Sequence, residues 1–332
     1  MHRIMLLFIT LFASSSCWSK TINLKRLFLA RQKKIPAIFH TDQLSMGEQL
    51  YTAIRDDMAA DALPKILKTT SKRLPAIRTG LCLSGGGVRA AMADAGVLRA
   101  LKDIGVLDAC SHVSSLSGSC YLLIAWVLSQ MEPKQFGEKL YPVFAHASRM
   151  PRIGDLGNFV SMVGRLVSRT MYPAFHAGYQ RLPISELKTL ANPLLFPYPI
   201  WTTISRYKAK TDDSYYWFDI SPHQVRMTSP DDDIFSWQTE LFGSVFRGGY
   251  LRKKRKEISL VQLTAICGAF FREMLSVSIP NPLYKIKGHP VANRKKAVLR
   301  DAGYANNLPL IPLLTPERKL DLIIVFDAGK TP

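Results

Sequence analysis

Ser117 lies in the short sequence SLSGS (115–119), between a strand-like run and an apolar, helix-like run. A serine in a sharp turn between a strand and a helix is typical of a nucleophile elbow. Such a turn exposes the hydroxyl, and the helix N-terminus favours developing negative charge. Ser-Gly-Ser is also common in ordinary loops, so the motif alone leaves a structural alternative open. It indicates a candidate nucleophile for acyl transfer.

A run of three glycines precedes Ser117 by about 30 residues, in the segment LCLSGGGVRA (81–90). Ordering glycine costs more backbone entropy than ordering any other residue, so such a loop usually serves a tight turn or a close approach of the backbone. The N–H groups of Gly86 and Gly87 are suited to stabilise the oxyanion of a tetrahedral intermediate. The loop lacks the Lys-Ser/Thr of a P-loop and the spacing of a dinucleotide fingerprint, which argues against nucleotide binding.

The elements that must position these motifs follow a strand–turn–helix pattern that occurs twice. We expect a strand, a helix, a second strand and a second helix at 76–84, 89–104, 110–117 and 119–128. This alternation predicts a parallel sheet with crossover helices. Two later apolar runs, 296–303 and 320–329, are typical of strands that are buried on both faces.

The remaining sequence predicts the domain organisation. Residues 20–75 contain a basic segment and a helix over 43–67, and residues 76–332 form the catalytic domain. Within that domain, residues 150–290 are rich in proline and aromatic residues, and we interpret them as an irregular cap insertion. The predicted fold class is therefore a three-layer α/β/α arrangement with a mostly parallel central sheet, a nucleophile elbow and a cap.

Residues 1–19 have the pattern of a secretory signal: Arg3, an apolar stretch too short to span a bilayer comfortably, and small residues that offer cleavage sites. The alternative is an uncleaved N-terminal anchor, and Cys17 weakly suggests a lipoprotein site. We expect export, with peripheral membrane association of the mature chain.

The composition limits the class of partner. The 332 residues are 47% hydrophobic, which allows a sizeable core, and their net charge is +19. Six Lys or Arg residues lie within 247–256. Such a balance favours an anionic partner, here an anionic phospholipid membrane surface, although a solvated basic surface is the alternative. No nucleic-acid-binding motif is present, no Cys or His spacing is typical of a metal site, and no protein partner is indicated.

Three motifs together resemble one known family. The segments SGGGVRA, LSGS and RDAGYANNLPLIPLL occur in the order found in the cytosolic phospholipase A2 / lysophospholipase (phospholipase B) family, whose fold is related to the patatin-like lipases. The similarity runs from about Gly80 to Trp126 and again from about Leu299 to Asp327. Together the motifs cover about a quarter of the chain.

The resemblance implies a role for each matching position. The family serine falls on Ser117 as nucleophile, and the family aspartate falls on Asp301, which serves directly as general base in a Ser–Asp dyad. The middle glycines fall on Gly86 and Gly87 as the oxyanion hole. The two family arginines that hold a substrate phosphate fall on these positions: Arg89 and Arg318. This chemistry needs no metal and no cofactor.

An aspartate base also makes sense from the residues themselves. A serine hydroxyl needs a base within hydrogen-bond reach, and none of the seven histidines lies in an expected setting. Asp301 follows an apolar strand and precedes a glycine, where a sheet presents catalytic groups; a turn-capping aspartate is the alternative.

Departures from the family pattern leave other functions open. Ser115 stands where the family has glycine, Val88 replaces an aromatic residue, and Ala302 follows the aspartate. The chain also ends soon after the strand expected at 320–329, whereas the family domains continue. We expect a lipid acyl hydrolase acting on glycerophospholipids or lysophospholipids. The alternatives are a truncated, inactive membrane-binding homologue and an acyltransferase or thioesterase with the same dyad.

Overall fold

The computed structural model describes residues 36–147, 182–208, 213–267 and 277–329. The expected signal sequence and the basic segment up to residue 35 lie outside these residues, as does part of the expected cap. Among the described residues, no helix is both long and apolar enough to cross a membrane.

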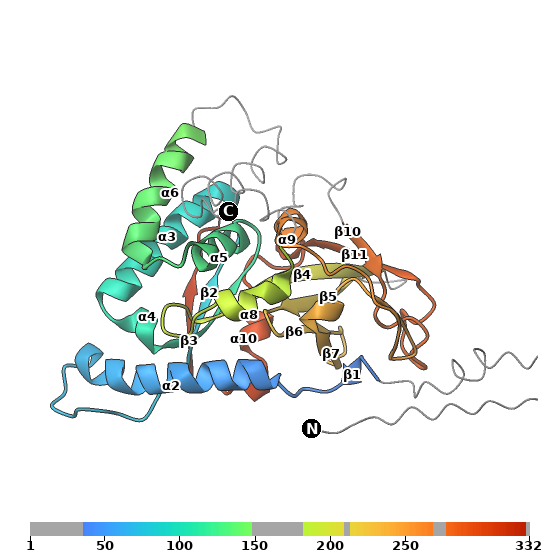
Figure 1. Ribbon diagram of the computed structural model, residues 1–332, viewed down its shortest axis with the longest axis horizontal. Coiled ribbons are helices and arrows are strands. Elements are labelled where there is room, and N and C mark those ends of the chain that lie inside the picture. Colours follow the sequence, from blue (N-terminus) through green and yellow to red (C-terminus); the bar gives the residue numbers. More distant parts are fainter. Residues whose placement is uncertain (1–35, 148–181, 209–212, 268–276, 330–332) are drawn as a thin grey trace, which may run out of the picture. The chain divides into compact units, whose positions relative to one another are not determined.

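One sheet dominates the described chain (Figure 1). Its strands run in the order β1-β7-β6-β5-β4-β3-β2-β12, with β11 and β10 branching from β4. The bounds of the strands in this sheet are β1 Phe39–His40, β2 Thr79–Leu83, β3 Cys110–Ser115, β4 Tyr198–Lys208, β5 Asp213–Ile220, β6 Gln224–Thr228, β7 Ile234–Gln238, β10 Val277–Pro280, β11 Lys296–Asp301 and β12 Leu322–Phe326. A separate hairpin is formed by β8 Val245–Arg247 and β9 Tyr250–Lys253.

The helices connect these strands and cover the sheet. Their bounds are α2 Met46–Ile66, α3 Gly87–Asp103, α4 Val106–Ala109, α5 Gly118–Ser129, α6 Pro133–Ala147, α8 Leu187–Leu190, α9 Leu260–Cys267 and α10 Leu310–Leu313. Short 3-10 turns follow β11 and α10, at Ala302–Tyr304 and Pro316–Arg318. The expected helix over 43–67 corresponds to α2, which Ser45 caps by accepting a hydrogen bond from the Glu48 N–H.

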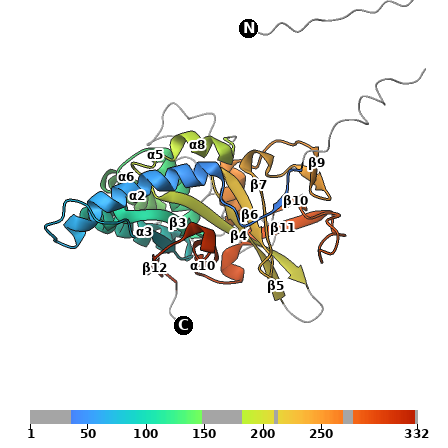
Figure 2. The ribbon, with the colours of Figure 1, turned by 90° about the horizontal axis from the view of Figure 1, so that it is seen from below.

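Alternating side chains of β3 show that helices lie on both faces of the sheet. His112 and Ser114 point to one face, where His112 meets Glu48 of α2 and Ser114 donates to the Pro309 carbonyl beside α10. Ser115 points to the other face, where its hydroxyl contacts Cys120 of α5. The predicted three-layer α/β/α class is therefore confirmed, and Figure 2 shows α2 crossing β3 and β4 on its face.

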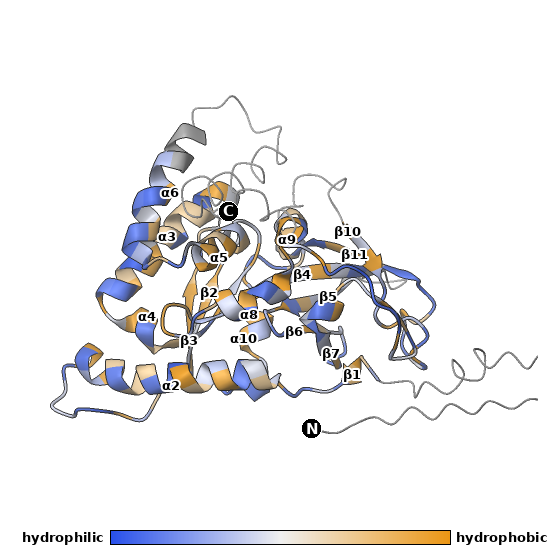
Figure 3. Cartoon of the chain, viewed as in Figure 1, coloured by the Kyte–Doolittle hydropathy of each residue, from blue (hydrophilic) through white to orange (hydrophobic). Residues whose placement is uncertain are grey.

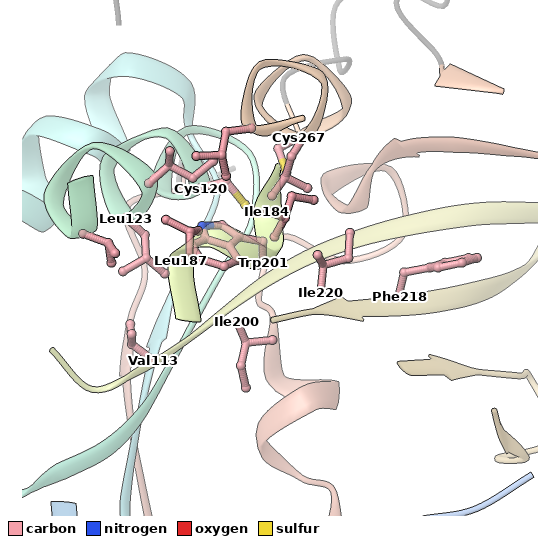
Figure 4. Close-up of a cluster of buried hydrophobic side chains, with 14 of the residues drawn as sticks. Val113, Cys120, Leu123, Ile184, Leu187, Ile200, Trp201, Phe218, Ile220 and Cys267 are labelled. Atoms are coloured by element: carbon pink, nitrogen blue, oxygen red, sulfur yellow. The ribbon is translucent and has the colours of Figure 1, made fainter. Parts of the chain in front are cut away.

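The core lies between the sheet and α5. Every residue of α5 is buried, as expected for a helix that is apolar all round. In Figure 3, α5 and β2 are coloured mainly as hydrophobic. Figure 4 shows Trp201 of β4 packed among Cys120 of α5 and Ile184 and Leu187 from the short helical segment before β4. This packing fixes α5, and with it the turn that precedes α5, on the parallel part of the sheet.

The structure corrects the expected cap. Much of the described part of 150–290 does not lie over the sheet but extends it, because β4 joins β3 in parallel and β5, β6 and β7 follow as antiparallel strands. Prolines and aromatic residues suggested irregular structure. However, Pro199 sits near the start of β4, and the aromatic residues of β5 fill both faces of a sheet. The parallel strands β12, β2, β3 and β4 form the part that carries the predicted site.

The two C-terminal strands also differ from expectation. β11 is present but runs antiparallel to β4, and β12 is a half-exposed edge strand beside β2 rather than a strand buried on both faces. The apolar sequence of β12 predicts a strand correctly but cannot show that β2 is its one neighbour in the sheet.

Candidate active site

The turn between β3 and α5 has the backbone geometry of a nucleophile elbow. Ser117 is the N-cap of α5 and has φ 52° and ψ −123°, a conformation that non-glycine residues rarely adopt. The N–H groups of Ser119 and Cys120 donate to the carbonyls of Leu116 and Ser117, which closes the turn. The chain therefore holds the Ser117 side chain, which is partly exposed, at the carboxyl end of a parallel strand.

Ser115 fits this turn although the family pattern has glycine there. Its hydroxyl is fully buried and donates to the Ile200 carbonyl of β4 at 3.2 Å. The extra side chain is thus accommodated by a hydrogen bond to the next strand.

The glycine loop lies directly against the elbow. Gly86 and Gly87 have φ 149° and 64°, conformations that favour glycine. A Cβ added to Gly118 would lie 2.0 Å from the Gly87 oxygen, so the first residue of α5 rests on the loop backbone. A Cβ at Gly87 would meet no atom within 4 Å, so this part of the loop faces open space. The role of the Gly86 and Gly87 N–H groups as oxyanion donors stays a prediction.

Strand β4 brings Asp301 to the nucleophile. Its residue Trp201 pairs with Ser115 of β3, and two positions further on Thr203 pairs with Asp301 of β11. The strand that ends two residues before Ser117 and the strand that ends at Asp301 therefore meet along one stretch of β4. This juxtaposition, between residues far apart in the sequence, is the central feature of the site.

The Asp301 carboxyl is buried and only partly paired. Its Oδ1 accepts a hydrogen bond of 2.8 Å from the Gly303 N–H, whereas no described residue meets hydrogen-bond geometry at Oδ2. Burial raises the pKa of Asp301 to about 7, although hydrogen bonding from the Gly303 N–H and the Ser117 hydroxyl counteracts part of that rise. The Ser117 hydroxyl thus lies near enough to lower the pKa of Asp301, and catalytic hydrogen bonds often reach full geometry only with substrate bound. The carboxyl has the proton affinity of a base that works near neutral pH.

Arg89 lies at the edge of the site. Its guanidinium is exposed, and Nη2 donates to the Ala328 carbonyl at 3.0 Å. The same Ala328 carbonyl lies against Gly86, so Arg89 holds the segment after β12 beside the glycine loop. Its predicted contact with a substrate phosphate stays a prediction.

Arg318 is not available to a substrate, and its predicted phosphate-binding role is wrong for this structure. It is fully buried, with Nε 2.7 Å from Glu48 Oε1 and Nη1 3.2 Å from Asp219 Oδ2. Burial alone would lower the pKa of Arg318, but these two carboxylates hold that pKa above its usual value. The guanidinium instead links α2 to β5 on the face of the sheet opposite α5.

Two polar residues that sequence reasoning did not assign also hold the glycine loop. Asn307 forms two hydrogen bonds with Gly85: its backbone carbonyl accepts from the Gly85 N–H at 3.0 Å, and its side-chain Nδ2 donates to the Gly85 carbonyl at 3.2 Å. Asn307 belongs to the NLP sequence after Asp301, so the motif contained a signal for it. Asp94, in the middle of α3, contacts Ser119, and no motif marked it.

The described ranges also show two features outside this site that bear on ligand binding. No group of three or more His, Cys, Asp or Glu side chains there could hold a metal ion. A cleft of about 740 Å³ lies between β1, the β6–β7 turn and the Pro316–Arg318 turn, and residues such as Asp42, Asp233 and Glu317 line it. It contains none of the predicted site residues.

The elbow, the glycine loop and the α/β/α layers define a patatin-like phospholipase fold. The structure is similar to human GIVD cytosolic phospholipase A2, with a TM-score of 0.63 and 19% identity, over 89% of this chain and 51% of that chain. A second structure of that protein, in complex with methyl gamma-linolenyl fluorophosphonate and terbium chloride, gives a TM-score of 0.59 and 20% identity, over 89% and 47%. The chain thus spans about half the length of these proteins. No protein-family model and no curated protein matches the sequence.

Proposed function

We propose that the protein is a lipid acyl hydrolase that cleaves fatty-acyl esters of glycerophospholipids or lysophospholipids. The observation that carries this proposal is the meeting, along β4, of the Ser117 elbow with the buried carboxyl of Asp301. The adjoining glycine loop and the likeness in fold to a phospholipase support the same chemistry.

The first half of the reaction forms an acyl-enzyme. Asp301 takes the proton of Ser117 as Oγ attacks the ester carbonyl carbon. The N–H groups of Gly86 and Gly87 stabilise the oxyanion of the tetrahedral intermediate. When the intermediate collapses, the bond to the leaving alcohol breaks, and Asp301 returns its proton to that oxygen.

The second half releases the fatty acid. Asp301, again ionised, takes a proton from a water molecule that attacks the acyl carbon. The second tetrahedral intermediate uses the same backbone donors. Its collapse breaks the bond to Ser117 Oγ, which recovers the proton from Asp301.

The exposed guanidinium of Arg89, two residues beyond Gly87, is suited to contact the phosphate of the substrate.

An anionic membrane surface is the partner that we propose. Eleven exposed Lys or Arg residues, without any Asp or Glu between them, lie on two segments: 245–256 and 285–296. These segments adjoin, because the Gly248 N–H donates to the Tyr284 carbonyl at 2.8 Å. Such a concentration of charge attracts anionic lipid.

The direct test is fatty-acid release from mixed phospholipid–detergent micelles and from lysophospholipid micelles by the purified protein. Ser117→Ala and Asp301→Asn should each lower the rate by a factor on the order of 10³ or more, because each removes a reacting group. Ser71→Ala and Asp103→Asn are matched controls, since both side chains are exposed and outside the site.

The outcomes separate the alternatives. An active Asp301→Asn variant would show that another group is the base. A folded parent that binds vesicles but releases no fatty acid from either substrate would favour an inactive membrane-binding protein. Acyl transfer to an added alcohol that outpaces hydrolysis would identify an acyltransferase.

A further inference from the structure

Asp94 is a buried carboxyl on α3 that faces the nucleophile elbow but takes no part in the proposed reaction. It is fully buried, its Oδ2 contacts the Ser119 hydroxyl, and no described residue forms a hydrogen bond with its Oδ1. The Ser119 hydroxyl also contacts the carbonyl oxygen of Ser84. Ser119 lies two residues after Ser117, and Ser84 is the residue from which the glycine loop begins. One hydroxyl thus joins α3, the elbow and the loop.

The number of protons in this cluster is informative. The Ser119 hydroxyl has one proton, and the Ser84 carbonyl and an ionised Asp94 carboxylate can only accept hydrogen bonds. If Asp94 is ionised, Ser119 can satisfy only one of them, and the other contact joins two oxygens with no proton between them. If Asp94 is protonated, it donates to Ser119, and Ser119 donates to Ser84. The observed pair of contacts is complete only with the neutral acid.

The surroundings favour the neutral acid as well. Burial raises the pKa of Asp94 to about 7, although the bond with Ser119 opposes this rise. The groups that face Asp94 are uncharged: α5 presents Ser119, and β2 presents Cys82, a thiol whose pKa burial raises to about 12. Titratable groups also occur on the other elements near α3, namely Asp108 on α4, Lys134, Glu138, Lys139 and Tyr141 on α6, and Asp327 after β12. No ion pair joins Asp94 to any of them in the described structure.

We propose that Asp94 is a positioning residue: as a neutral acid it donates to Ser119, so that Ser119 holds the Ser84 carbonyl and keeps the glycine loop against the elbow. This inference rests on the proposed hydrolase function. Ser84 is held on its other side, where its N–H donates to the Phe326 carbonyl and its hydroxyl accepts from the Ala328 N–H. Loss of the Asp94 proton would free the loop on the side that faces the nucleophile.

The two buried carboxyls must be in opposite protonation states for the protein to be active. Asp301 must lose its proton to act as base, whereas Asp94 must keep its proton to hold the loop. Hydrolysis should therefore rise and then fall with pH, and the two limbs should belong to different residues.

The test compares variants of Asp94 that keep or remove the donor. Asp94→Asn carries an amide that donates to Ser119 at every pH, so it should abolish the alkaline fall in kcat and leave the acid limb unchanged. Asp94→Ala should lower kcat about tenfold or more below pH about 7, where the parent keeps the Asp94 proton, with a smaller change in KM. Ser119→Ala should have a similar effect, and the double variant little more, because both changes break one chain of hydrogen bonds.

A second measurement separates this inference from the proposed function. At pH about 6 the infrared carbonyl band of neutral carboxylic acids should contain one component from Asp94 and one from Asp301, which Asp301→Asn removes. The Asp94 component should disappear as the pH rises above about 7, and it should be missing in Asp94→Asn but not in Glu138→Gln. The alkaline fall in the rate at which a fluorophosphonate probe labels Ser117 should follow the loss of the Asp94 component of this band. An unchanged alkaline limb in Asp94→Asn, or absence of the Asp94 component in an active parent, would overturn the inference. A parent with the Asp94 component and with probe labelling that follows it, but without turnover, would overturn the proposed function alone.

Discussion

Asp301 is the residue whose protonation state the proposed reaction depends on. Burial raises the pKa of its carboxyl from 3.8 to about 7. Only the ionised form can accept the Ser117 proton, so kcat/KM should rise as the pH approaches about 7. In Asp94→Asn, which should lack the alkaline fall, kcat/KM should level off above that pH. A pH profile of fatty-acid release measures this limb. A rate that stays constant from pH about 5 to 8 would contradict the assignment of Asp301 as base.

The raised pKa of Asp301 also determines how its contribution to protein stability changes with pH. The folded-state pKa of Asp301 lies above the unfolded value, so the native state binds the proton more tightly. The contribution of this carboxyl is therefore fully present below pH about 4 and is lost as pH rises toward 7. Asp301→Asn should accordingly raise the melting temperature at pH about 8 more than at pH about 4, and the exposed Asp103→Asn control should not.

Single residues also show how far a motif can predict a site. The sequence placed Ser117, Gly86, Gly87 and Asp301 in motifs, and the structure brings all four together. Arg318 was predicted from the same kind of match but is buried between Glu48 and Asp219. Its two partners lie 270 and 99 residues away in the chain, and no local pattern reveals such pairings.

At the scale of elements, the site depends on the contact between the first turn of α5 and the glycine loop. A methyl group at Gly118 would overlap the Gly87 backbone, so Gly118→Ala must displace the loop rather than a flexible side chain. We expect a loss of about 1–3 kcal/mol in the free energy of unfolding. Misplaced oxyanion donors should lower the rate by a factor on the order of 10²–10³. Thermal unfolding and fatty-acid release measure the two effects.

Gly96→Ala on α3 is the matched control for this variant. Its Cβ would meet only the Tyr141 hydroxyl at 3.5 Å, an ordinary contact, within a regular helix. Alanine there should stabilise the protein by about 0.5–1 kcal/mol without a change in rate. If Gly118→Ala behaved like Gly96→Ala, the elbow and the loop would not be in the contact that the structure shows.

The helices and strands near the site could be predicted from the sequence, whereas strands β4 to β7, which extend the sheet, could not. Periodic apolar residues predicted α2 and α3, a continuous apolar run predicted α5, and the runs of the parallel strands β2 and β3 were equally clear. β4 was missed because Pro199 and its aromatic neighbours suggested loop structure. Yet β4 is the strand that joins Ser117 to Asp301. Its pairing with β3, β5 and β11 depends on contacts between distant segments, which a local pattern does not contain.

At the scale of the whole molecule, the net charge of +19 is unevenly distributed. Segments 245–256 and 285–296 carry eleven exposed cations, and Asp231 and Asp233 interact electrostatically with His289 in the second segment. Each cation near an anionic bilayer contributes about 1 kcal/mol at low salt. A single substitution should therefore have little effect, whereas several together should weaken binding strongly.

The triple variant Lys253→Glu, Lys254→Glu, Lys256→Glu tests this surface by sedimentation with phosphatidylserine-containing vesicles. It should bind at least about 30-fold more weakly, and the difference should shrink as salt is added. The control Lys65→Glu, Lys68→Glu, Lys72→Glu changes the net charge equally at the C-terminal end of α2, and Figure 2 shows that end and β9 at opposite sides of the view. Equal losses in the two variants would mean that net charge alone attracts the vesicles. A loss in the first variant only, with hydrolysis of detergent-dispersed substrate unchanged, would locate the membrane contact on the two basic segments and separate it from the chemistry of Ser117.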